Sequence, residues 1–286
     1  MSVLSDELGK DGASSTVRMA AGLALKNSLT SKEQPKQSRL RSKWLQGVNP
    51  DVRKQVKEVA LETLGAKDRQ AAAQAAQLVA AIATIEIPQN EWPELMPQLV
   101  HKVGTGPDNL KISSLITIGF ITESEDQDLR RSLFVLSSAI LTAVVQGARK
   151  DEPNDDVRLA AMQALAESLD FVEQNMEDEG ERNFILQVVC EATQAENDSI
   201  KQSAFGCLNK IVGLYYRHMP FYMEKALYGL TIEGMKNEDE DVAKLAVEFW
   251  CTVCEEEWGL LEASRAVSCT QIHGGDQTTD RVLAAI

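Results

Sequence analysis

Two cysteines three residues apart have the spacing in this chain that most resembles a chemical motif. Cys251 and Cys254 lie in the segment VEFWCTVCEEE. A CxxC pair holds zinc when a second CxxC or a histidine pair completes four ligands, and it forms a redox centre within a thioredoxin-like βαβ unit. Neither companion is found in the sequence. We therefore interpret the pair as part of the apolar face of a helix and predict no metal site and no cofactor.

The remaining side chains that could do chemistry are scattered. The three histidines, His101, His218 and His273, are far apart and lie near no serine or cysteine in a nucleophile pattern. Carboxylate pairs such as Glu123 with Asp126 fall in predicted turns, where helix capping and solvation explain them. No glycine-rich phosphate loop and no GxSxG motif occurs. The sequence predicts that the protein is not an enzyme.

A short repeated pattern points to binding instead. An apolar residue is followed by a small residue four places on and a large apolar residue eight places on, which places all three along one helix face. Copies begin at Val17, Leu110, Val157, Ile200 and Val242. The spacing of the last three copies falls in the range of about 40–47 residues that is typical of HEAT and armadillo arrays. In such arrays a long surface serves for binding.

Each copy is predicted to be the second, inner helix of a pair. First, outer helices are predicted to begin at Asp51, Trp92, Leu133, Glu181 and Phe221, and a further inner helix at Asp68. We expect Asp155 or Asp156 to cap the helix that opens at Val157. The eighth-place residues Leu165, Leu208 and Trp250 should be buried. The fold class is thus all-α, an α-solenoid of about six helix pairs with no sheet, in which residues 1–264 form the array.

The amino-acid composition limits the kinds of partner that the protein can bind. The chain of 286 residues has a formal net charge of −14 and no visible basic stripe, so nucleic acid is an unsuitable partner. An acidic surface suits basic protein partners, and it equally suits simple solubility. Five cysteines without a disulfide spacing indicate reduced thiols in a cytosolic or nuclear protein. No apolar run approaches the roughly 18 residues of a membrane span, and no signal peptide opens the chain.

Apolar residues on two successive outer helices could form a shallow groove. They lie at helical spacing, with one carboxylate among them, and are Leu141, Thr142 and Val145 on the first helix and Glu181, Phe184 and Ile185 on the next. Neighbouring outer helices of a solenoid stand side by side, so the two sets could leave a groove between them. The alternative is that these residues only pack one helix against another.

Several blocks of the chain resemble the importin-β family of karyopherins. They are RMAAGLALKNSLTSK (18–32), IEIPQNEWPELMPQLV (85–100), VVQGARKDEP (144–153), FILQVVCEATQ (184–194), LYYRHMPFYM (214–223) and EFWCTVCEEE (248–257). The resemblance runs almost continuously from Val17 to Ser264. It implies a right-handed superhelix of HEAT repeats and a nuclear transport receptor, found in the cytoplasm, in the nucleus and at the nuclear pore.

The resemblance also implies site residues. In the family, the positions that match the two sets from Leu141 to Ile185 form a pocket for the phenylalanine of FG-repeat nucleoporins. Tyr222 and Leu230 match a second such pocket. The inner helices of the first repeats hold the small GTPase Ran in its GTP form, and Lys26 and Asn27 match that region. The alternative for Lys26 and Asn27 is a solvated helix end, where lysine opposes the helix dipole.

The resemblance has limits at both ends. Family members begin with one more helix pair, so the first pair here is expected to be incomplete, and they continue for many repeats after Ser264. Because the site for the importin-α arm lies mainly in later repeats, we expect this chain to bind that arm weakly or not at all. Residues 265–286 depart from the family and are expected to be a mobile tail, above all 268–280. A generic HEAT scaffold, such as a phosphatase subunit, is the alternative function.

Overall fold

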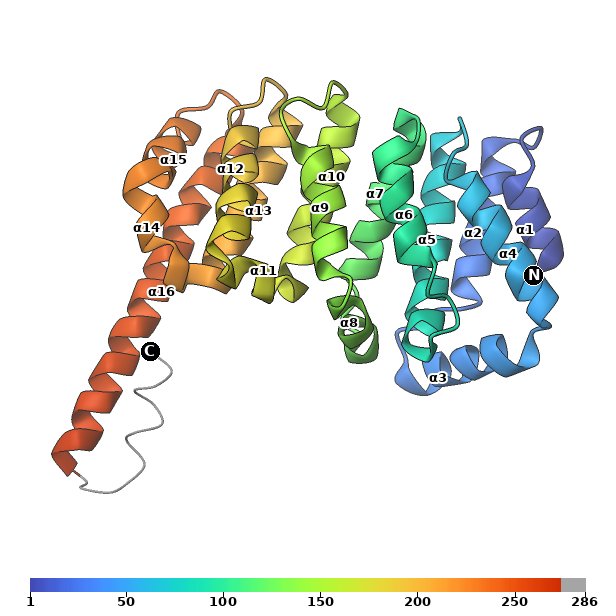
Figure 1. The fold of residues 1–286 in the computed structure, drawn as a ribbon, viewed down its shortest axis with the longest axis horizontal. Coiled ribbons are helices and arrows are strands. Elements are labelled where there is room, and N and C mark those ends of the chain that lie inside the picture. Colours follow the sequence, from blue (N-terminus) through green and yellow to red (C-terminus); the bar gives the residue numbers. More distant parts are fainter. Residues whose placement is uncertain (274–286) are drawn as a thin grey trace. The chain divides into compact units, whose positions relative to one another are not determined.

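The structure is a computed structural model that describes residues 1–273, with side chains to Arg265. The described residues form helices and turns and contain no strand. The chain divides into two compact units, Met1–Cys207 and Leu208–Ile286, and Figure 1 shows the helices of each. The predicted all-α class is confirmed.

Unit 1 contains two rows of helices. The outer row consists of α1 (Ser2–Gly9), α4 (Pro50–Thr63), α6 (Leu95–Thr105), α9 (Ser137–Ala148) and α12 (Glu179–Ala192). The inner row consists of α2 (Ser15–Asn27), α5 (Arg69–Glu86), α7 (Asp108–Thr122) and α10 (Asp155–Ser168). Each inner helix packs on its outer partner, and successive inner helices pack on one another from α2 through α5 and α7 to α10. Helix α13 (Asp198–Tyr215) follows α12, and in unit 2 α15 (Tyr228–Gly234) packs against α16 (Glu240–His273), so the order of helices along the described chain matches the six pairs predicted.

Helix starts follow the capping residues of the sequence, with one correction. Asp68 caps α5 by accepting from the backbone N–H groups of Gln70 and Ala71. The cap of α10 is Asn154, not Asp155 or Asp156 as predicted, because α10 begins two residues before Val157. The two aspartates lie in the first turn instead, where negative charge is favourable.

The outer helix predicted from Leu133 is two helices. Leu133 lies in the last turn of a short helix, α8 (Gln127–Phe134), and α9 begins at Ser137 after a bend of 83°. Asp126 starts α8 by accepting from two backbone N–H groups. An aspartate cap upstream of an apolar run thus starts a separate helix, which the apolar periodicity alone did not reveal.

The core confirms two of three predicted positions. Leu165 and Leu208 are fully buried. Trp250 is only half-buried, and its neighbour Phe249 fills the core instead. The indole N–H of Trp250 donates to Thr231 Oγ1 at 3.1 Å, which gives this large side chain a position at the edge of the core where its polar group is satisfied.

Helix α5 has more buried residues than any other helix of unit 1. Many of its inward positions are alanines, among them Ala71, Ala75 and Ala76, all without exposed surface. Small side chains let α2, α4 and α7 pack closely around it. Contrary to the expectation from the sequence, one segment, Arg69–Gln89, is long and apolar enough to cross a membrane, but 67% of its apolar window is buried by the rest of the protein. It is therefore a core helix.

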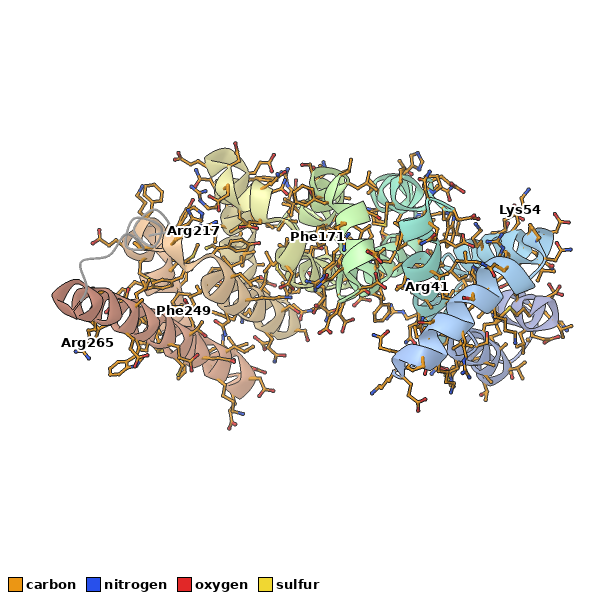
Figure 2. All side chains as sticks on the ribbon, turned by 90° about the horizontal axis from the view of Figure 1, so that it is seen from below. Arg41, Lys54, Phe171, Arg217, Phe249 and Arg265 are labelled. Carbon is orange, nitrogen blue, oxygen red and sulfur yellow. The ribbon has the colours of Figure 1, made fainter. Side chains whose placement is uncertain are left out.

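The segment between the first two pairs contains an element that the sequence did not predict. Helix α3 (Gln34–Ser42) continues into a π-turn, η1 (Lys43–Gly47). Trp44 of this turn is buried and donates to Glu86 Oε1 at 2.8 Å. Arg41, labelled in Figure 2, pairs with the α8 cap Asp126 at 2.7 Å. These contacts attach α3 to α5 and α8 within unit 1.

In unit 2, the single helix predicted from Phe221 is divided into shorter elements. The unit contains α14 (Pro220–Tyr222), a π-turn η5 (Met223–Leu227), α15 (Tyr228–Gly234) and α16 (Glu240–His273). Helix α16 continues past Arg265, where the repeat pattern was expected to stop, to His273. Phe249 lies in the core of this unit, whereas Arg265 is exposed far along α16 (Figure 2). The remainder of the predicted tail, 274–286, lies outside the described residues.

Short helical turns connect these elements. They are η2 (Ile87–Gln89) after α5, η3 (Leu169–Phe171) and α11 (Glu173–Glu177) between α10 and α12, and η4 (Tyr216–His218) after α13.

Candidate protein-binding surfaces

The predicted groove residues lie on two helices that pack side by side. Helices α9 and α12 are in contact. Leu141, Val145 and Ile185 are buried, with 6%, 1% and 1% of their surface exposed. Thr142, Glu181 and Phe184 are exposed, Phe184 at 43%. The six residues thus separate into three buried apolar side chains and three exposed ones.

A buried amide that the sequence analysis missed joins these two helices. Asn175 lies on α11 with only 4% of its surface exposed. Its Nδ2 donates to Ser138 Oγ of α9 at 3.1 Å and, through a short hydrogen bond, to the Glu181 carboxylate of α12. Its Oδ1 is buried without a hydrogen-bond partner. Glu181, in the first turn of α12, is therefore bonded to a buried residue of α11.

The second predicted pocket, Tyr222 and Leu230, lies in unit 2 on both sides of the π-turn. Tyr222 of α14 and Leu230 of α15 are both half-buried. The Tyr222 ring stands edge-on to Phe221 with 5.0 Å between centroids. Phe221 is 53% exposed, and Lys225 Nζ lies 3.5 Å from its ring centroid. Exposed aromatic surface is therefore present beside the predicted pair.

Lys26 and Asn27 end helix α2, as predicted. Lys26 is half-buried, and its Nζ donates to Gln77 Oε1 of the adjacent inner helix α5 at 3.4 Å. Asn27 is exposed. Lys26 thus has a structural partner inside the protein, while Asn27 faces solvent.

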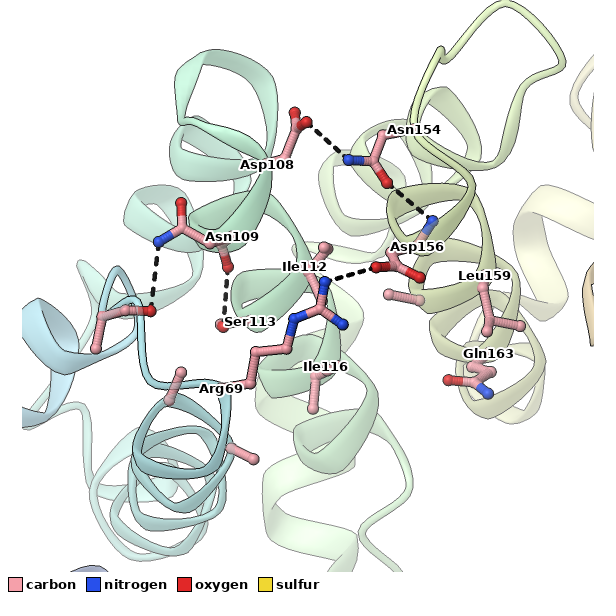
Figure 3. Close-up of a pocket in the computed structure, with 14 residues that line it drawn as sticks. Arg69, Asp108, Asn109, Ile112, Ser113, Ile116, Asn154, Asp156, Leu159 and Gln163 are labelled. Carbon is pink, nitrogen blue, oxygen red and sulfur yellow. Dashed lines mark hydrogen bonds and ion pairs between the residues drawn. The ribbon is translucent and has the colours of Figure 1, made fainter. Parts of the chain in front are cut away.

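The inner row carries a cavity that the sequence analysis missed. It has a volume of about 310 Å³ and lies between α5, α7 and α10 (Figure 3). Apolar side chains line it, among them Ala73, Ile112, Ile116 and Leu159. The residues come from three successive inner helices, so only the packing of the helices brings them together.

Polar side chains surround this cavity. Arg69 of α5 pairs with Asp156 of α10 at 2.9 Å (Figure 3), and both side chains are exposed, at 83% and 52%. Asn154 donates to Asp108 at 2.7 Å. Asn109 donates to the backbone carbonyl of Gly65 at 2.6 Å. The rim thus has two carboxylates and one guanidinium group around an apolar interior.

The cysteine pair does not lie where the sequence suggested. Cys251 and Cys254 are exposed on α16, so the expected place on an apolar, buried face is wrong. Among the described residues, no group of three or more histidine, cysteine, aspartate or glutamate side chains is arranged to hold a metal ion.

The sequence of this chain is similar to those of known proteins. Residues 1–66 match the family model of the importin-beta N-terminal domain. The chain is 54% identical over 258 residues to importin subunit beta-1 of Schizosaccharomyces pombe and 49% identical over 241 residues to that of Saccharomyces cerevisiae. These matches cover 90% and 84% of this chain but only 29% and 28% of the relatives.

Solved structures agree over nearly the whole chain. A crystal structure of importin beta in an ammonium sulfate condition is 53% identical, with a TM-score of 0.90, and is matched over 98% of this chain and 32% of that one. A Kap95:Nup1 complex is 43% identical with a TM-score of 0.83, over 97% and 32% of the two chains. A structure in which Kap95p binding induces the switch loops of RanGDP to adopt the GTP-bound conformation is 41% identical with a TM-score of 0.81, over 97% and 31%. Because sequence and helix-pair architecture agree over nine tenths of its length, this chain belongs to the importin-β family.

Proposed function

We propose that this chain is the part of a nuclear transport receptor that binds FG-repeat nucleoporins on its outer helices and the small GTPase Ran, in its GTP form, on its inner helices. Its relatives support this function, since the Kap95 structures that it matches at 43% and 41% identity are complexes with Nup1 and Ran. The chain spans about three tenths of those relatives, so it carries a corresponding part of their surface.

The observation that carries the nucleoporin proposal is the contact between α9 and α12, the two helices that hold all six predicted residues. Phe184 and Thr142 are exposed on these helices, Val145 is buried, and Glu181 is exposed in the first turn of α12. A phenylalanine side chain that is fully buried gains about 1.5–3 kcal/mol, and association entropy offsets much of this gain. One FG motif should therefore bind weakly. Several motifs on one chain would gain by binding several surfaces, including the one beside Tyr222 and Leu230.

The proposal that Ran binds this chain concerns the inner row of helices. Asn27 is exposed at the end of α2, and Lys26 lies beside it. Both residues belong to the block 18–32, which resembles the importin-β family. We propose that Asn27 contacts the GTPase and that Lys26, already bonded to Gln77, contributes its charge.

The proposal also covers the partners that we do not expect and the place of the protein in the cell. We propose no nucleic acid, membrane or cofactor partner, weak or no binding of the importin-α arm, and no catalysis. The protein would move between cytoplasm and nucleus through the nuclear pore.

Phe184→Asp tests the nucleoporin proposal. Val145 and Ile185 are unsuitable positions, because a charge there would be buried and would unfold the protein. Phe184 is 43% exposed, and Phe134 of α8, at 42%, provides a matched control. We expect Phe184→Asp to reduce binding to immobilised FG-repeat chains about tenfold or more and Phe134→Asp to leave it unchanged. Equal binding by the parent protein, Phe184→Asp and Phe134→Asp would reject the assignment of this surface as a nucleoporin site.

A pull-down with Ran loaded with GTP or GDP tests the inner row. We expect the GTP form to bind more tightly and Asn27→Ala to weaken it without affecting FG binding. The alternative, a generic HEAT scaffold, predicts that the parent protein binds neither FG chains nor Ran.

A further inference from the structure

We propose that the exposed side of α3 and of the start of η1 is a docking site for a short protein segment rich in aspartate and glutamate. The site consists of Lys36, Arg39 and Lys43, here named the basic stripe. Helix α3 belongs to neither row of helices, so these residues are distinct from those proposed above to bind nucleoporins and Ran. The proposal depends on neither of those functions.

The segment that carries the basic stripe has a charge opposite to that of the whole chain. Residues 32–43 include five basic residues and one acidic residue, whereas the chain has a net charge of −14. A cluster this short was not visible from the total charge of the sequence. Lys36, Arg39 and Lys43 stand at i, i+3 and i+7, which places them on one face of a helix.

The other side of this helix attaches it to unit 1. Trp44 is buried, and its indole N–H donates to Glu86 Oε1 at 2.8 Å. The guanidinium group of Arg41 pairs with Asp126 at 2.7 Å, so this cation already has a partner. Helix α3 itself has no buried residue, and it runs across the ends of neighbouring helices (Figure 1). The helix therefore adds no side chain to the core, and what it presents to solvent is mainly positive charge.

The cations of the basic stripe have no partner of their own. Lys36, Arg39 and Lys43 are exposed, and none of them forms an ion pair within the part of the chain that the structure describes. Like charges three and four residues apart on a helix repel one another and destabilise it slightly. Carboxylates of a bound partner would remove this repulsion, which favours an acidic partner over an empty surface.

The length of the basic stripe and the charge of the whole chain determine the kind of anion. A helix rises 1.5 Å per residue, so the stripe is about 10 Å long, which is close to the Debye length of about 8 Å at physiological ionic strength. A nucleic acid or an anionic membrane extends well beyond this length and would be repelled by the rest of a protein with a net charge of −14. A short acidic segment contacts the stripe alone.

Fluorescence anisotropy with a labelled glycine–serine peptide that carries a run of glutamates tests the proposal. A matched peptide carries glutamines in their place. We expect the glutamate peptide to bind about tenfold or more tightly than the glutamine peptide, and its affinity should fall as sodium chloride is added. A single-stranded oligonucleotide of equal length and vesicles containing phosphatidylserine are the comparison probes. Tighter binding of either one would overturn the choice of a protein segment.

Lys36→Glu separates an effect on binding from an effect on folding. Lys36 lies in the first turn of α3, where negative charge is favourable to a helix, so the variant should remain folded while one charge of the basic stripe is reversed. We expect the glutamate peptide to bind about fivefold more weakly to it.

Lys244→Glu is the matched control, because it changes the net charge of the protein by the same amount. Lys244 is 68% exposed on α16 of unit 2, and its replacement should leave the affinity within about twofold of the parent. Circular dichroism checks that both variants are folded. Equal binding of the glutamate and glutamine peptides, or an equal loss of affinity in the two variants, would overturn the proposal.

Discussion

The side-chain amide of Asn175 donates to Ser138 Oγ at 3.1 Å, which connects the short helix α11 to α9. The same amide donates to Glu181 of α12. One buried residue therefore connects both helices of the candidate nucleoporin groove. Its position determines where the groove carboxylate stands, since Glu181 is otherwise on an exposed first turn of α12.

Asn175→Ala should destabilise unit 1 and weaken FG binding together. Loss of the amide removes its hydrogen bonds to Ser138 and Glu181, and because both of these residues are exposed to water, the cost in the free energy of unfolding is that of ordinary hydrogen bonds, about 0.5–1.5 kcal/mol. Urea unfolding followed by circular dichroism measures this cost. Gln174→Ala is the control, because Gln174 lies exposed on the same short helix. Equal midpoints for the two variants would show that the bridge contributes nothing.

Leu165→Ala should lower the free energy of unfolding by about 2–5 kcal/mol, as a truncation in a packed core does. Leu165 has no exposed surface on α10. Leu23→Ala on α2, where the side chain is 43% exposed, provides the matched control with a change below about 1 kcal/mol. Urea unfolding of both variants checks the difference, and similar losses would contradict the assigned core.

Thiol reactivity should separate the cysteines. Burial, and then the charge of Glu191, raises the pKa of Cys190 to about 11, so its thiolate is scarce at pH 8. Cys251 and Cys254 are exposed. In a Cys269→Ser background, we expect a thiol-specific chromogenic reagent to label Cys251 and Cys254 within minutes and Cys190 only after unfolding in guanidinium. Cys190 is half-buried, and its fast labelling in the native protein would contradict the raised pKa.

The phenol of Tyr216 should lose its proton at a higher pH than an ordinary tyrosine does. Burial, and then its hydrogen bond to the Glu257 carboxylate, raises the pKa of this phenol to about 12 from an ordinary value of 10. Because the folded pKa is the higher one, the stabilisation is fully present below pH 10 and is lost as the pH rises through about 12. Tyrosinate absorbance of the parent minus that of Tyr216→Phe gives this titration. Glu257→Gln should lower the pKa, and an unchanged value would exclude the carboxylate as a cause.

The sequence by itself determined the helical class, the pairing of helices and the family. Apolar side chains recurring along one helix face define each inner helix, and their spacing defines the repeat, because both signals are local to a few turns of chain. Leu165 and Leu208 were identified as core in this way.

Only the tertiary structure decided which side chains meet. Asn175 and Ser138 are on different helices, and Arg69 and Asp156 belong to different repeats, so no spacing in the sequence reveals either pair. The exchange of Trp250 for Phe249 in the core has a similar reason. A helix rotates by about 100° per residue, so which of two adjacent aromatic residues faces inward depends on how the neighbouring helix α15 packs and on Thr231, which accepts the indole hydrogen bond.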